Sequence, residues 1–193
     1  MTEGALPDRA RLVIIGAGIV GCSAAYHLSR LGWRDMVVVD QGPLFETGGS
    51  TSHAPGGVFQ TNFSKMMTDF ARYTVELYDG LALDGECCFH MVGGLEVALT
   101  QERFEDLKRK VGVAKSWGVE AGLISPEETR DKVPILDPAQ IQGAYWVPSD
   151  GIAKPVRAGA AMAQMAEGAI FYGETAVEGF AVKNGRVQAV LTV

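Results

Sequence analysis

The apolar residues of the first forty positions fall into short runs that alternate with a glycine-rich turn and a helical pattern. Residues 11–15 form an apolar run that ends at a glycine, and its length and composition predict a buried strand. Residues 22–31 place Ala and Leu at helical spacing, and Gly32 follows where a helix commonly ends. Residues 36–39 predict a second buried strand. This order of strand, helix and strand is typical of an α/β domain.

The pattern changes over residues 41–64, which are dense in Gly, Ser, Thr and Pro and predict a long ordered loop. Loops of that length inside a compact domain are usually functional. Beyond the loop, helices are expected at 65–81, 101–117, from 125 onward and at 155–167. Strands are expected at 88–99, with a kink at Gly93-Gly94, and at 141–147, 169–172, 175–182 and 186–193. Asn184-Gly185 between the last two strands predicts a hairpin. Because domains rarely stop just after such a strand, we expect this chain to be the N-terminal part of a longer protein.

The turn after the first strand carries a dinucleotide-binding motif, Gly16-x-Gly18-x-x-Gly21. The first glycine permits a tight turn, the second lets the backbone approach a pyrophosphate, and the third lets helix and strand pack closely. Asp40 ends the second strand 19 residues after Gly21, where an acid is expected to meet ribose hydroxyls. A 2′-phosphate there would face a carboxylate, which argues against NADP. This motif alone leaves FAD and NAD both open.

Composition and charge exclude several other classes of protein. The 193 residues carry a net charge of −6 and no basic block, so we expect no nucleic-acid partner. No apolar run approaches the roughly 18 residues that cross a bilayer, so no membrane partner is expected. The first ten residues lack a signal or transit pattern, which predicts a cytoplasmic protein, or one of the mitochondrial matrix if a transit peptide has been removed. The three cysteines match no zinc or redox spacing, and we expect no metal site.

Several further motifs, in order along the chain, resemble FAD-dependent amine oxidoreductases of the D-amino-acid-oxidase superfamily, the group of dimethylglycine oxidase and of dimethylglycine and sarcosine dehydrogenases. The likeness covers nearly the whole chain. It is carried by residues 40–44, 48–57, 58–62, 92–98, 117–118, 123–127 and 147–151. The resemblance favours FAD over NAD. An NAD enzyme would also begin another βα repeat soon after the second strand, where this chain has its Gly/Ser/Thr loop.

The resemblance implies an α/β fold, a Rossmann-like FAD-binding domain with an inserted antiparallel substrate-binding domain. We expect the first part of the FAD domain at 1–84, part of the substrate domain at 85–150 and a return to the FAD domain at 151–193. By the same resemblance, the loop at 48–57 wraps the pyrophosphate and the flavin edge, His53 matches a histidine that carries the flavin covalently, and the backbone of Val177 meets the adenine. The expected cofactor-binding residues are Gly16, Gly18, Ile19, Val20, Gly21, Asp40, Gln41, Gly48, Gly49, Ser50, Thr51, His53, Gly57 and Val177.

The implied reaction is oxidation of an N-methyl amino acid, such as dimethylglycine or sarcosine, by hydride transfer to the flavin. A small-molecule amine is therefore the expected partner. No catalytic residue is expected within this chain, because the catalytic groups of the family and its folate-binding region lie later in sequence. We expect little or no turnover from these 193 residues. The alternatives are another amino-acid oxidase, an NAD-dependent dehydrogenase, or a domain that binds a nucleotide without catalysis. Lys154 and Arg157 could pair with a substrate carboxylate, although solvated surface charge is the simpler interpretation.

Overall fold

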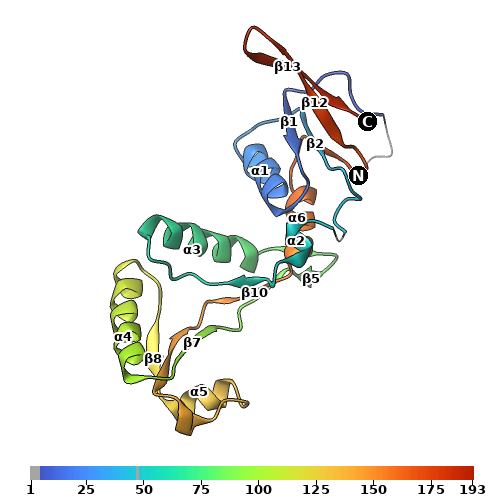
Figure 1. Ribbon diagram of the computed structural model, residues 1–193. Helices are drawn as coiled ribbons and strands as arrows, with labels where there is room; N and C mark the ends of the chain where they lie inside the picture. The colour runs from blue at the N-terminus through green and yellow to red at the C-terminus, as the bar shows by residue number, and fades with distance from the viewer. Residues whose placement is uncertain (1–4, 47) are drawn as a thin grey trace. The chain divides into compact units, whose positions relative to one another are not determined.

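A computed structural model describes residues 5–46 and 48–193 of the chain (Figure 1). It divides into two compact units. The first unit comprises Met1–Gly56, Leu81–Cys88 and Lys154–Val193, and the second comprises Gly57–Gly80 and Phe89–Ala153.

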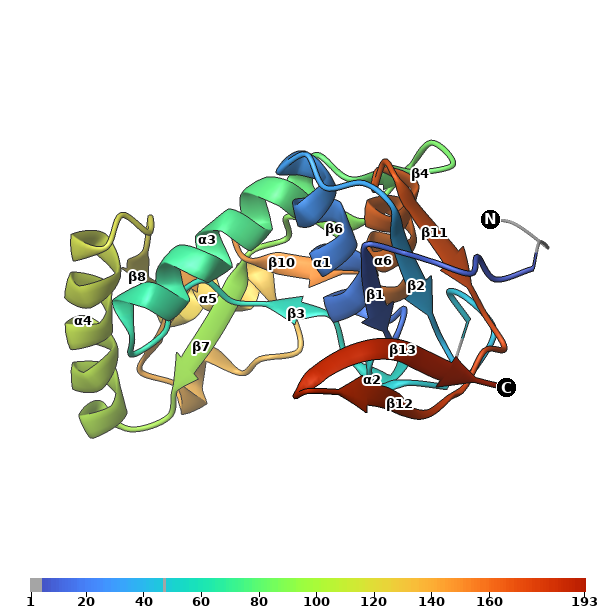
Figure 2. The same ribbon diagram turned by 90° about the horizontal axis from the view of Figure 1, so that it is seen from above.

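The first unit is built on a parallel three-stranded sheet. Its strands are β1 (Leu12–Ile15), β2 (Met36–Val39) and β11 (Ala169–Tyr172), in the order β1-β2-β11. All four residues of β2 are buried, as expected for a central strand covered on both faces. Two helices, α1 (Ile19–Arg30) and α6 (Pro155–Gln164), pack against each other and lie beside the strands (Figure 2).

The long loop predicted at 41–64 is more structured than expected. It contains the one-turn helix α2 (Ser50–His53) and the short strand β3 (Gly57–Val58). The hydroxyl of Ser52 accepts a hydrogen bond from the Gly48 N–H at 3.0 Å and donates one to the Gly49 carbonyl at 2.8 Å. These local side-chain bonds hold the turn together without any apolar periodicity, which is why the sequence pattern did not reveal it.

Two hairpins complete the first unit, and the sequence predicted one of them. The confirmed hairpin joins β12 (Val177–Lys183) to β13 (Arg186–Thr192) through Asn184-Gly185, with both turn residues at positive φ. The other joins β4 (Ala82–Leu83) to β5 (Glu86–Cys87). Its strands are two residues long, too short to show an alternating pattern.

The second unit has two antiparallel sheets and three helices. One sheet has the order β7-β9-β8 and the other β3-β10-β6. The strands are β6 (Phe89–His90), β7 (Gly94–Ala98), β8 (Gly122–Ile124), β9 (Gly143–Val147) and β10 (Gly151–Ala153), and the helices are α3 (Lys65–Asp79), α4 (Gln101–Ser116) and α5 (Pro126–Lys132), with a 3₁₀ turn at Pro138–Gln140. Helix α4 packs on its sheet through a core that includes Leu107, Ala114, Tyr145 and Val147. None of the helices in the described ranges is long and apolar enough to cross a membrane.

The strand expected at 88–99, with a kink at Gly93-Gly94, is divided in the structure into β6 and β7, which residues 91–93 separate. Gly93 lies at φ +80, and a Cβ there would stand 1.8 Å from the Trp146 ring. Residues 57–80 belong to the second compact unit, whereas the sequence assigned them to the FAD-binding part; the limits of the FAD-binding and substrate-binding domains stay a prediction. In the structure, Val75 of α3 packs in a buried cluster with Phe89 and Ala153, within the second unit.

Candidate cofactor-binding site

The glycine motif forms the turn between β1 and α1. Gly16 lies at φ +101, a backbone conformation that side chains other than glycine rarely adopt. A Cβ on Gly21 would stand 1.8 Å from the Gly16 carbonyl oxygen, so any larger residue would separate helix from strand. The sequence therefore needs glycine here for backbone geometry, as predicted from the motif.

The N-terminus of α1 faces a cavity and is suited to an anion. Gly18 occupies the N-cap position without a side-chain cap, and the first turn holds no acidic residue. The Ile19 N–H donates to the Thr51 hydroxyl at 2.9 Å, which ties α2 to the start of α1. Helix N-termini carry unpaired N–H groups and a partial positive charge, the combination that binds phosphate.

Asp40 joins the glycine turn to the segment after β2. One carboxylate oxygen accepts the Ala17 N–H at 2.7 Å, and the other accepts the Gly42 N–H at 2.9 Å. Its own backbone N–H donates to the Tyr172 carbonyl, and its carbonyl accepts from Thr175. Each carboxylate oxygen keeps further acceptor capacity for a ligand hydroxyl. Asp40 thus holds the loop in place and also borders the cavity.

The cavity at the α1 N-terminus has a volume of about 470 Å³. Most of the residues expected at the cofactor line it. The lining comprises Ala17, Gly18, Ile19, Asp40, Gln41, Gly42, Pro43, Phe45, Glu46, Gly48, Gly49, Ser50, Thr51, Ser52, Val156 and Gly159. The part of the lining contributed by α6 was not predicted from the sequence. The only signal for it was the run of small residues in that helix, which allows Gly159 to approach Ile19 of α1.

The other expected residues lie outside the lining of this cavity. Gly16 and Gly21 shape the turn behind it, and Val20 is 79% exposed on α1. His53 is exposed at the last position of α2, and Val177 packs against a buried cluster of β2 and β11. Gly57 belongs to β3 in the second unit.

Cys22 lies directly behind the glycine turn and is fully buried. Burial raises the pKa of its thiol to about 12, and the nearby Asp40 carboxylate acts in the same direction. The thiol therefore stays protonated at neutral pH and donates to the Ala17 carbonyl at 3.1 Å. This is a packing and hydrogen-bonding role, not that of a reactive thiolate.

The two basic residues after β10 are engaged within the first unit. Arg157 donates to the Leu83 carbonyl at 2.6 Å and lies 3.5 Å from the Glu86 carboxylate, while Lys154 lies 3.7 Å from the same carboxylate. Both cations thus attach the β4–β5 hairpin to α6, which accounts for them without a substrate.

The second unit holds a smaller cavity of about 320 Å³ beside a buried polar cluster. Asp150 is 4% exposed and accepts bonds from the backbone and side-chain amides of Gln60, at 2.9 and 3.2 Å. Burial raises the pKa of Asp150 above its ordinary value, and the Gln60 bonds oppose this. Burial likewise raises the pKa of Tyr145, whose hydroxyl pairs with Thr61 at 2.5 Å. This cluster anchors the chain before α3 to the end of β9.

Comparison with known proteins assigns the family. The model of the DAO family, FAD dependent oxidoreductase, matches residues 11–193. Mouse mitochondrial sarcosine dehydrogenase is 31% identical over 187 residues, 95% of this chain and 20% of that protein. The mouse mitochondrial pyruvate dehydrogenase phosphatase regulatory subunit is 33% identical over 192 residues, 97% of this chain and 22% of that protein.

Among solved structures, L-proline dehydrogenase from P. horikoshii matches with a TM-score of 0.86 and 31% identity, over 97% of this chain and 50% of that one. This match confirms the predicted mixed α/β fold. The chain spans about a fifth of the length of these curated relatives and half of the matched structure. The glycine turn, the Asp40 bonds and these similarities agree, and the chain belongs to the DAO family of FAD-dependent oxidoreductases.

Proposed function

We propose that this chain supplies the dinucleotide site of an enzyme that oxidises a secondary or tertiary amine of an amino acid, of the dimethylglycine or sarcosine type. The observation that carries the proposal is the cavity bounded by the α1 N-terminus and by Asp40. The partial positive charge of the helix N-terminus suits a pyrophosphate, and the Asp40 carboxylate suits ribose hydroxyls. When bound, FAD supplies the acceptor for the two electrons of the oxidation.

The residues of this chain would bind and orient the cofactor. Gly18 and Ile19 offer the helix N-terminus to the phosphates, and Asp40 offers its free acceptor positions to the ribose. The loop at 48–52 forms another wall of the cavity. His53 follows that wall directly, and its exposed imidazole is the candidate for a covalent bond to the flavin. By the family resemblance, the Val177 backbone is assigned to the adenine and Gly57 to the loop at the flavin.

The names of the relatives support the substrate class. Sarcosine and proline are both amino acids with a secondary amine, and proteins named for their oxidation match this chain at 31% identity. The mitochondrial location given for the sarcosine dehydrogenase supports the matrix as the compartment. We assign no catalytic residue to this chain and expect little or no amine oxidation from it. Measurable turnover of sarcosine or dimethylglycine by the 193 residues would overturn that part.

The test is the visible spectrum of the purified protein after reconstitution with FAD, recorded before and after acid precipitation. Flavin colour that stays in the pellet and is lost in His53→Ala supports the covalent bond. The control is His90→Ala, an exposed histidine that the proposal gives no cofactor role. Colour released to the supernatant supports bound FAD and contradicts a covalent bond to His53. No retained flavin in a folded protein contradicts the cofactor assignment.

A second candidate is a nucleotide-binding part of a regulatory protein without catalysis. It is supported by the relative named as a regulatory subunit, which matches 97% of this chain. Both candidates predict FAD binding, so the discriminating measurement is bleaching of the flavin by sarcosine or dimethylglycine under anaerobic conditions, in the longest form of the protein that the gene encodes. Bleaching supports the enzyme, and a stable oxidised flavin supports the regulatory alternative.

A further inference from the structure

Phe45 adopts an unusual backbone conformation at the wall of the cavity. It lies at φ 60, in the left-handed region. The other residues with positive φ in the described ranges, glycines aside, are Asp35, Asp84, Glu174 and Asn184. Short polar residues such as Asp and Asn tolerate this region, whereas a bulky aromatic residue does so only under constraint. Such outliers concentrate at ligand-binding sites, which makes Phe45 a candidate for a functional role.

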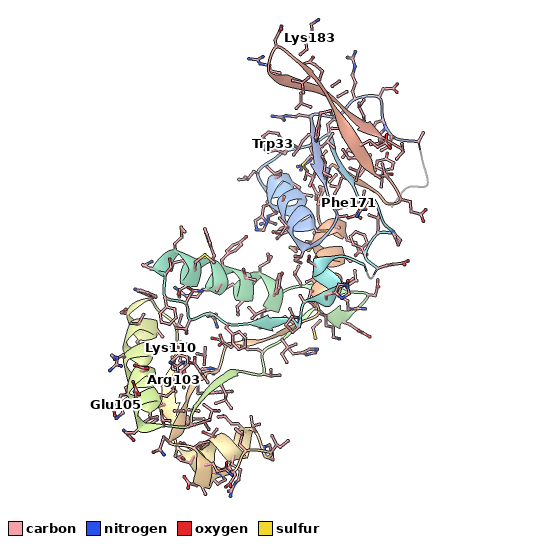
Figure 3. All side chains as sticks on the ribbon, viewed as in Figure 1. Trp33, Arg103, Glu105, Lys110, Phe171 and Lys183 are labelled. Atoms are coloured by element: carbon pink, nitrogen blue, oxygen red, sulfur yellow. The ribbon has the colours of Figure 1, made fainter. Side chains whose placement is uncertain are left out.

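The surrounding structure holds Phe45 in place. Its ring lies 5.9 Å from the ring of Phe171, at an interplanar angle of 53°. Phe171 is buried in β11, one of the two edge strands of the sheet (Figure 3). The preceding segment is also fixed, because the Gly42 carbonyl accepts the Glu174 N–H at 2.9 Å. A ring anchored on a buried strand forms a rigid wall.

The residues that share the cavity with Phe45 indicate what it would meet. The anion-binding end is formed by the α1 N-terminus, and Asp40 follows as the acceptor for ribose hydroxyls. In a dinucleotide the base is joined to the ribose, and Gln41, Pro43 and Phe45 line the same cavity as Asp40. Phe45 is the aromatic residue of that lining, and aromatic rings bind bases by stacking.

We propose that Phe45 is a positioning residue that packs against the adenine base of the bound cofactor and so favours an adenine dinucleotide over a flavin lacking that half. The proposal rests on the proposed function. The competing interpretation is packing alone, because Phe45 also lines a neighbouring cavity of about 660 Å³ with Phe171 and residues of α6.

The test compares the binding of ADP and of inorganic pyrophosphate by titration calorimetry to the 193-residue protein and to Phe45→Leu and Phe45→Tyr. Leucine keeps apolar contact with Phe171 and lacks the aromatic ring, while tyrosine keeps the ring. We expect Phe45→Leu to weaken ADP binding about tenfold, and Phe45→Tyr to stay near the wild type. Pyrophosphate has no base, so its affinity should not change. Phe45→Met serves the same comparison if the leucine variant does not fold.

Each outcome decides the matter. Equal ADP affinity in Phe45→Leu and the wild type overturns the role of Phe45, as does an equal loss for ADP and pyrophosphate, which indicates a distorted loop. Failure of the wild type to bind ADP contradicts the proposed function itself, and with it this proposal.

Discussion

Neutralising Asp40 is a revealing test of the site, because this carboxylate is expected both to stabilise the glycine turn and to bind the cofactor. Its two oxygens accept the Ala17 and Gly42 N–H groups at 2.7 and 2.9 Å. Hydrogen bonds to a charged group contribute about 1.5–3 kcal/mol each. Asp40→Asn keeps one acceptor oxygen and turns an NH₂ group toward the other N–H, so it should lower the free energy of unfolding by about 2–3 kcal/mol. Asp40→Ala loses both bonds and should cost about 3–6 kcal/mol.

The loss should also appear in cofactor binding. The glycine turn would no longer be held for the phosphates, and the ribose would lose an acceptor, so Asp40→Asn should weaken FAD binding on the order of 100-fold, equivalent to about 2.7 kcal/mol. Urea denaturation measures the stability, hydrogen exchange at the Ala17 and Gly42 amides reports the loop, and flavin fluorescence measures the affinity. The control is Asp35→Asn, since Asp35 accepts one exposed bond from Arg11. Wild-type exchange at both amides in Asp40→Asn would refute the reasoning.

Three further predictions follow from particular contacts. Gly21→Ala places a methyl group 1.8 Å from the Gly16 carbonyl oxygen, so it should destabilise the protein by about 3 kcal/mol or more and abolish FAD binding. The control, Gly112→Ala, lies in open space on α4 and should stabilise the protein by about 0.5–1 kcal/mol. A Gly21→Ala protein of unchanged stability would contradict the close approach of helix and strand. Because the folded protein holds the Asp150 proton more tightly than the unfolded chain, this group's contribution to stability is full below its ordinary pKa of 3.8 and is lost as pH rises through the raised folded-state pKa. Asp150→Asn should remove that slope in denaturation curves across pH, and an unchanged slope would show that the pKa is not raised. Ser125→Ala deletes the capping box with Glu128 at the start of α5 and should lower the free energy of unfolding by about 1 kcal/mol, measured by thermal unfolding. The control is Ser116→Ala at the last residue of α4, where the hydroxyl donates to the Val113 carbonyl, and it should change the stability little.

The elements that the sequence predicted are those whose signal is local. Four consecutive apolar residues in β2, glycines at fixed spacing, and an Asn-Gly turn each act within a few neighbours. The helix α1 begins three residues before the predicted start at 22, because glycine at its N-cap and at Gly21 hides the helical period. Strands of two or three residues, such as β4, β5 and β10, have no period to detect. β4 and β5 pair only with each other, and β10 exists through pairing with the distant strands β3 and β6.

The same distinction applies to the site. Gly18 and Asp40 were expected at the site from the motif, and Thr51 from the family resemblance of its loop, and all three line the cavity. The contributions of Val156 and Gly159 depend on α6 packing against α1, more than a hundred residues later in the chain, which no spacing reports. The role of Phe45 depends on a backbone angle and on Phe171, and neither is visible in composition. Long-range packing therefore sets the part of the site that the sequence could not predict.

The most direct test of the account is equilibrium titration of FAD into the folded 193-residue protein, followed by flavin fluorescence and with ADP as competitor. The account predicts saturable binding of one FAD per chain, displacement by ADP, and loss of binding in Gly21→Ala. A protein that is folded by circular dichroism and binds neither FAD nor ADP would contradict the assignment of the cavity as a dinucleotide site.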